Sequence, residues 1–238
     1  MPNTVLLNNV DHKDLRVITR RGARMGDAQM SAVTFPNEFR DIQACYPIVF
    51  RKTTDGLGFE PIALLGFEEE ENLFLKGEQW DAPYIPMLIE RQPFLIGIGG
   101  ARGDELMVHI DTDNPRVSQF DGELVFKPHG GSTDFLERAT SLLQAIHQGL
   151  QDTPALLAAL QEHELLEGFV LDIELNDGSQ NRLVGFYTIN EDKLSALGAE
   201  AIARLHQAGH LHAIYMVLAS LSNFRMLIDR KNARLAYA

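Results

Sequence analysis

Two side chains with metal-binding chemistry, His109 and Asp111, are separated by one apolar residue. On a strand, the two-residue period places both side chains on the same face of the sheet. The His-x-Asp spacing is that of the facial triad of non-haem Fe(II) oxygenases, which needs a second histidine. His129, His147 and His163 are the candidates for that ligand. An Fe(II)-dependent oxygenase is therefore one alternative, and a hydrogen-bonded surface pair is the other.

The remaining polar motifs do not assign a catalytic residue. His206, His210 and His212 form the densest histidine cluster, but Gly209 is expected to end or bend the helix that would carry them. The glycine-rich segment 97–103 precedes a strand-like run rather than a helix, so it predicts a hairpin and not a phosphate loop. Cys45 is the only cysteine and is expected to be a buried, inert thiol. Catalysis is therefore left open, with no residue to carry it.

The segment 80–94 has the composition of a recognition surface. It contains the single tryptophan, three prolines, two further aromatic residues and an arginine. Prolines restrict the backbone, and large aromatic residues with arginine dominate binding hot spots. Trp80, Tyr84, Arg91 and Phe94 are therefore predicted to line a groove for a peptide or protein client, with Arg91 available to a carboxylate. The alternative is that these side chains only fill corners of the core.

Composition limits the class of protein. The chain has 238 residues, a hydrophobic content of 45% and a net charge of −12, which disfavours electrostatic binding to nucleic acid. Residues 1–10 lack the basic and apolar regions of a signal peptide. The longest apolar stretches fall short of the roughly 20 residues of a membrane span. We therefore expect a cytoplasmic protein without membrane insertion.

The pattern of apolar residues predicts an α+β fold in two parts with one shared core. Residues 1–130 form a part rich in antiparallel strands, punctuated by glycine turns, and residues 131–238 form an α+β part. In the second part a helix starts at Asp134 in a capping box with Glu137, and Thr153 and Pro154 are expected to begin a second helix and complete a helical hairpin. Alternation in residues 169–175 and 182–188 predicts a β-hairpin, Asn190 caps the next helix, and a long helix ends the chain.

The order of several segments resembles the bacterial SapC family. These segments are Tyr-Pro-Ile-Val-Phe at 46–50, the Tyr-Ile-Pro and Arg-x-Pro-Phe elements of residues 80–94, the acidic hairpin, and Leu-Ala-Ser-Leu at 218–221. The resemblance covers residues 35–231. It implies an accessory role in surface-layer biogenesis or secretion, and it supplies no catalytic residues. A peptide-uptake permease shares the family label but is a membrane protein.

Together these observations favour a cytoplasmic accessory protein that recognises a polypeptide client. The first alternative is the Fe(II) oxygenase with His109 and Asp111 as ligands. The second is a structural homodimer that associates through the terminal helix, whose apolar residues recur at helical spacing from Leu211 to Ile228.

Overall fold

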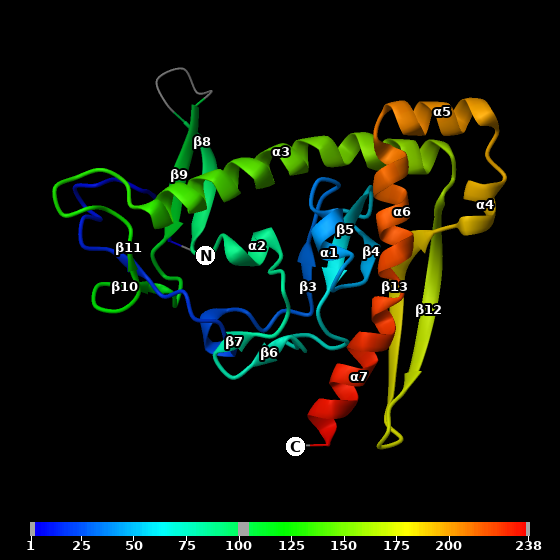
Figure 1. Cartoon of the computed structure of the whole chain (residues 1–238), viewed down its shortest axis with the longest axis horizontal. Helices are drawn as coiled ribbons and strands as arrows, with labels where there is room; N and C mark the ends of the chain where they lie inside the picture. The colour runs from blue at the N-terminus through cyan, green and yellow to red at the C-terminus, as the bar shows by residue number, and fades with distance from the viewer. Residues whose placement is uncertain (1–2, 100–104, 237–238) are drawn as a thin grey trace. The chain divides into compact units, whose positions relative to one another are not determined.

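The computed structural model describes residues 3–99 and 105–236 and divides into two compact units (Figure 1). The first unit is built from residues 1–28, 75–80 and 87–148. The second is built from residues 29–74, 81–86 and 149–238. Antiparallel sheets dominate the N-terminal part, and helices, a β-hairpin and a long helical segment follow. The predicted α+β class is therefore confirmed.

Two small antiparallel sheets and a ribbon form the strands of the first unit. One sheet has the order β1-β9-β8, with bounds Thr4–Leu6, Glu105–Asp111 and Phe94–Gly99. The other has the order β10-β2-β11, with bounds Val117–Ser118, Arg16–Val17 and Glu123–Leu124. The ribbon pairs β6 (Leu75–Lys76) with β7 (Gln79–Trp80). The short helices η1 (Ala23–Met25) and α2 (Met87–Glu90) complete the unit, together with the first half of α3 (Asp134–Glu162).

The core of the first unit lies between the β1-β9-β8 sheet and α3. Phe94 of β8 and Ile110 of β9 are opposite each other in the register and are both buried. They belong to one hydrophobic cluster with Leu136 and Leu143 of α3. Because side chains alternate along a strand, the residues between them on β8 and β9 face away from this cluster. One face of the sheet is therefore packed, and the other carries Met107, His109 and Asp111.

A five-stranded antiparallel sheet forms the second unit, in the order β12-β13-β4-β5-β3. The strand bounds are Leu166–Glu174, Gln180–Ile189, Ile48–Lys52, Phe59–Leu64 and Ser31–Val33. The predicted hairpin is confirmed as β12 and β13, which pair from Leu166 with Ile189 to Glu174 with Gln180. The helices are α1 (Phe39–Ile42), α4 (Glu191–Ser195), α5 (Ala199–Gln207), α6 (His210–Ser220) and α7 (Asn223–Leu235). Asn190 caps α4 as predicted, since its side chain accepts a hydrogen bond from the Lys193 amide.

The terminal helical segment runs alongside the β12–β13 hairpin (Figure 1). The rings of Phe169 on β12 and Phe224 on α7 are 6.0 Å apart in an edge-on arrangement. Ser220, at the end of α6, accepts a hydrogen bond of 2.8 Å from the buried Ile48 amide of β4. Only two residues separate α6 from α7, so the predicted long C-terminal helix is confirmed with a short interruption.

The helical hairpin predicted around Pro154 is wrong, because α3 continues without a break from Asp134 to Glu162. Proline removes one backbone N–H from a helix interior. The preceding Thr153 is buried, and its hydroxyl donates to the Gly149 carbonyl at 2.8 Å. α3 starts at Asp134 as predicted, but its capping residue differs from the prediction by one position. Thr133, not Asp134, is the cap, and its hydroxyl accepts from the Leu136 amide at 3.3 Å.

A buried lysine anchors α7 within the second unit. The Lys231 ammonium lies 2.7 Å from a carboxylate oxygen of Glu71 and 2.9 Å from one of Glu68. Burial alone lowers the pKa of Lys231, but the hydrogen bonds and charges of Glu71 and Glu68 outweigh burial and raise the pKa above its ordinary value of 10.5. The protonated lysine therefore stabilises the folded state.

This raised pKa predicts a loss of stability in alkali. Stabilisation from Lys231 is fully present below its unfolded pKa of 10.5 and disappears as the pH rises through the higher folded pKa. Urea unfolding at pH 9 and pH 11.5 should give a lower unfolding free energy at the higher pH. Lys231→Met should shrink this difference, whereas Lys127→Met, which removes an exposed lysine, should retain it. An equal pH response in both variants would contradict the assignment.

Candidate functional site

The four residues of the predicted client groove fall in different units. Trp80, Arg91 and Phe94 belong to the first unit and Tyr84 to the second. Phe94 is 1% exposed and lies in the core cluster of the first unit, so its ring is packed inside the protein. Arg91 is half-buried and donates to the Phe94 carbonyl at 2.7 Å, and burial lowers its pKa. Trp80 is half-buried in β7, where it pairs with Leu75.

Tyr84 belongs to a buried polar network in the second unit. Its hydroxyl donates to Glu38 at 3.0 Å, and the other oxygen of that carboxylate accepts from Thr34 at 2.7 Å. The Tyr84 carbonyl accepts from the Tyr46 hydroxyl. Glu38, Thr34 and Tyr46 are all fully buried. These contacts give Tyr84 a structural role in fixing the segment after β7.

The two residues of the metal hypothesis share one face of β9, as the period of the strand predicts. His109 and Asp111 pair with Leu6 and Thr4 of β1 in the sheet register. Among residues 3–99 and 105–236, no group of three or more His, Cys, Asp or Glu side chains is arranged to hold a metal ion. The oxygenase alternative thus rests on the pair alone.

Cys45 is a buried free thiol, in agreement with the sequence-based expectation. Burial raises the pKa of its thiol, opposed by a hydrogen bond from the Tyr84 backbone and the charge of Arg230. Since the thiolate is the nucleophilic form, a raised pKa together with burial makes this side chain unreactive.

A pocket of about 510 Å³ opens in the first unit at the start of α3. It lies where the β10-β2-β11 sheet meets the first turn of this helix. Five charged side chains line it, together with Thr133 and Phe135: Arg16, Lys127 and Arg138 are cationic, and Glu123 and Asp134 are anionic. The pocket was not predicted, because Arg16 is more than a hundred residues from the others in sequence.

Local backbone geometry positions Arg16 at the pocket. Gly122, in the turn between β10 and β11, has a φ of 101°, and a Cβ there would lie 2.2 Å from the Val17 carbonyl oxygen. Only glycine allows so close an approach to β2. The Gly122 carbonyl consequently accepts a hydrogen bond of 2.9 Å from the Arg16 guanidinium, which holds this cation in the wall of the pocket.

Thr133 fixes the other wall. Its hydroxyl lies 2.7 Å from the Leu124 carbonyl and caps α3 through the Leu136 amide. The helix therefore starts directly beside β11. Arg138 is one turn further along α3 and is exposed, as is Lys127 on the loop before Thr133. Lys127, Thr133 and Arg138 lie close together in sequence around the predicted helix start, and this clustering is a signal from which part of the pocket could have been found.

The three cations of the pocket are set apart from the ion pairs of the protein. Within the part of the chain that the structure describes, none of Arg16, Lys127 and Arg138 lies within 4.0 Å of an acidic oxygen. Three cations and two anions give the lining a net charge of +1, whereas the whole chain carries −12. The pocket is thus a local reversal of the overall charge, which favours a ligand with negative charge.

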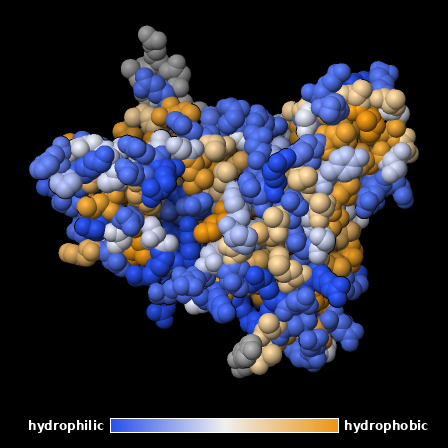
Figure 2. Space-filling view, in the orientation of Figure 1, coloured by the Kyte–Doolittle hydropathy of each residue, from blue (hydrophilic) through white to orange (hydrophobic). Residues whose placement is uncertain are grey.

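The terminal helical segment presents apolar side chains outside the core. Over the region of α4, α5 and α6 hydrophobic residues are visible at the surface (Figure 2). Tyr215 of α6 is 52% exposed. By length and composition alone, His210–Leu235 is a candidate membrane span, and 28% of its apolar 18-residue window is buried inside the protein. This is weak evidence, since helices of soluble proteins pass the same test.

The structure is that of an α+β protein with a pocket whose lining carries a net positive charge. The SapC family model matches residues 7–227, so the chain belongs to the SapC family, as its sequence resemblance indicated. No curated protein and no solved structure matches the chain.

Proposed function

We propose that this SapC family member is a cytoplasmic accessory protein that binds a polypeptide client with a carboxylate-bearing segment, in surface-layer biogenesis or secretion. One observation carries the proposal: Arg16, Lys127 and Arg138 line one pocket in a chain of net charge −12, and none of them pairs with a carboxylate of residues 3–99 or 105–236. Cations that are not neutralised within the protein remain available to an external anion.

The same charges favour a peptide over a nucleic acid. A nucleic acid presents a phosphate at every nucleotide and needs an extended basic surface. The pocket lining has three cationic and two anionic side chains. This small excess of positive charge suits a ligand that carries one or two carboxylate groups. Guanidinium groups bind carboxylates through paired hydrogen bonds, and the Phe135 ring adds apolar surface to the lining. An acidic side chain or a C-terminal carboxylate of a client fits this chemistry.

The proposal is tested with a defined peptide. A fluorescein-labelled hexaglutamate peptide should bind the protein, with the fluorescence anisotropy falling as salt rises from 50 to 200 mM, because surface charges are screened. The double variant Lys127→Ser/Arg138→Ser should weaken binding about tenfold or more, which corresponds to ~1.4 kcal/mol. Both side chains are exposed, so the fold should be retained.

Arg225→Ser is the matched control, since Arg225 is an exposed cation of α7 outside the pocket. It should leave the affinity for hexaglutamate within about twofold, the effect of one distant surface charge. A hexaserine peptide should not bind. Equal affinity of the double variant and the Arg225→Ser control, or equal binding of both peptides, would remove the pocket from the proposed site.

Association through α6 is a second proposal. The exposed Tyr215 and the limited burial of the apolar window within His210–Leu235 favour a homodimer formed along this helix.

A further inference from the structure

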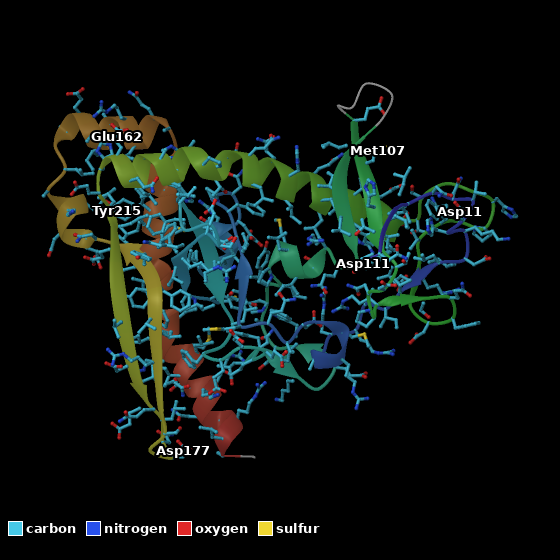
Figure 3. The ribbon with its side chains drawn as sticks, turned by 180° about the vertical axis from the view of Figure 1, so that it is seen from behind. Asp11, Met107, Asp111, Glu162, Asp177 and Tyr215 are labelled. Atoms are coloured by element: carbon cyan, nitrogen blue, oxygen red, sulfur yellow. The ribbon has the colours of Figure 1, made fainter. Side chains whose placement is uncertain are left out.

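The outward face of the β1-β9-β8 sheet carries two soft or borderline metal ligands side by side. Met107 and His109 are two residues apart on β9 and lie on the face opposite the hydrophobic core. Figure 3 labels Met107 towards one end of this strand and Asp111 towards the other. Both Met107 and His109 are half-buried rather than fully exposed. Their thioether and imidazole groups therefore share a partly desolvated surface.

Two glycines of β8 form the cradle for these side chains. A Cβ on Gly97 would lie 2.7 Å from Cε1 of His109, and a Cβ on Gly99 would lie 2.7 Å from Sδ of Met107. The imidazole and the thioether thus rest directly on the backbone of the neighbouring strand. Because Gly97 and Gly99 are two residues apart, the two groups lie side by side at roughly 7 Å. Rotation about the flexible methionine side chain can close this separation.

The imidazole is oriented as a metal ligand would be. His109 Nδ1 lies 3.2 Å from the Met107 carbonyl oxygen. A carbonyl only accepts, so this contact places the proton on Nδ1 and leaves the lone pair on Nε2. Metal-binding histidines commonly use one ring nitrogen for such a bond and the other for the metal. Leu6 and Leu95 flank His109 in the register, which gives the ring apolar neighbours.

The geometry points to a Cu(I) site formed by the Met107 thioether and His109 Nε2. Thioether ligands select Cu(I), and imidazole is an accepted ligand of copper. Zn²⁺ and Fe(II) need more nitrogen, sulfur or carboxylate ligands; in the described part of the chain such a cluster is absent. Cu(I) accepts low coordination numbers, so two protein ligands suffice. This site is separate from the cationic pocket and does not depend on the proposed client.

The test is a Cu(I) titration in a Cys45→Ala background, because the thiol is itself a soft ligand. Anaerobic protein should withdraw one equivalent of Cu(I) from bicinchoninate. Met107→Leu keeps the volume of the side chain, and His109→Asn keeps a polar group. Each should lower the Cu(I) affinity at least about tenfold, which is ~1.4 kcal/mol per ligand. In ¹⁵N spectra, the His109 Nε2 signal should shift on Cu(I) binding while Nδ1 stays protonated.

Matched controls distinguish this site from adventitious binding. Met226→Leu and His206→Asn remove the same chemical groups from α7 and α5, and both should leave the Cu(I) affinity unchanged. The inference is overturned if the Cys45→Ala protein withdraws no Cu(I), or if Met107→Leu binds Cu(I) as tightly as Met226→Leu.

Discussion

Replacing Asp27 with alanine should destabilise the protein by about 3–5 kcal/mol, the cost of leaving a buried charge without its partner. Asp27 is fully buried and lies 2.6 and 2.7 Å from the guanidinium of Arg116, which is 1% exposed. The Gly22 amide donates to the same carboxylate at 2.8 Å. Burial lowers the pKa of the nearby Arg21, the Arg116 charge adds to this shift, and Asp27 opposes it. Without Asp27, two cations would face each other in the interior.

Urea unfolding of Asp27→Ala against Asp121→Ala provides the comparison. Asp121 also binds an arginine, Arg20, at 2.7 Å, but both partners are substantially exposed. An exposed ion pair contributes only about 0–1 kcal/mol. The double variant Asp27→Leu/Arg116→Met should lose less stability than Asp27→Ala, because it removes both buried charges. Similar losses of unfolding free energy in Asp27→Ala and Asp121→Ala would show that the buried ion pair stabilises the protein no more than the exposed one.

Gly149→Ala is expected to destabilise the second unit by about 3 kcal/mol, although the same change in an exposed helix would stabilise it by about 1 kcal/mol. Gly149 lies inside α3, where a Cβ would be 2.1 Å from the ring of Phe35. The Phe35 ring is 1% exposed, so neither it nor the helix can move aside without disturbing the core. Thermal and urea unfolding of Gly149→Ala measure the effect.

A double-mutant cycle with Phe35→Leu tests the cause. Phe35→Leu alone should destabilise through the cavity it leaves. Combined with Gly149→Ala, it should cost less than the sum of the two single changes, since the new methyl group gains space. Additive losses, or a stabilised Gly149→Ala protein, would contradict the close contact between α3 and Phe35.

Local patterns predicted the elements whose signals lie within a short stretch of chain. The β12–β13 hairpin is predicted by the strict alternation of apolar and polar residues and by an Asn-Asp-Gly turn. The cap at Asn190 is predicted because an asparagine side chain can accept a hydrogen bond from a free amide at the start of a helix. The helix break at Pro154 was wrong because tertiary packing outweighs the missing hydrogen bond. Proline is costly in a helix interior, yet Leu156 and Leu160, which follow it, are almost fully buried.

The cationic pocket could not be predicted in the same way, since it depends on contacts distant in sequence. Arg16 reaches the start of α3 only because β2 pairs with β10 and β11. In the aromatic segment 80–94 the sequence predicted a binding surface from residue types alone. Its residue types are those of binding surfaces, but composition does not state which side of a strand is buried, and the Phe94 ring lies inside the core.

The segments of the two units alternate along the sequence, so the units cannot be completed one after the other during synthesis on the ribosome. The first unit ends at Gln148, whereas the second combines residues 29–74 and 81–86 with residues 149–238. Strands β3, β4 and β5 are therefore synthesised before β13. The backbone hydrogen bonds that β4 makes with β13 can form only after β13 has been translated. Truncation after α3 should yield a chain in which the first unit is complete and the early strands of the second remain exposed to chaperones or aggregation.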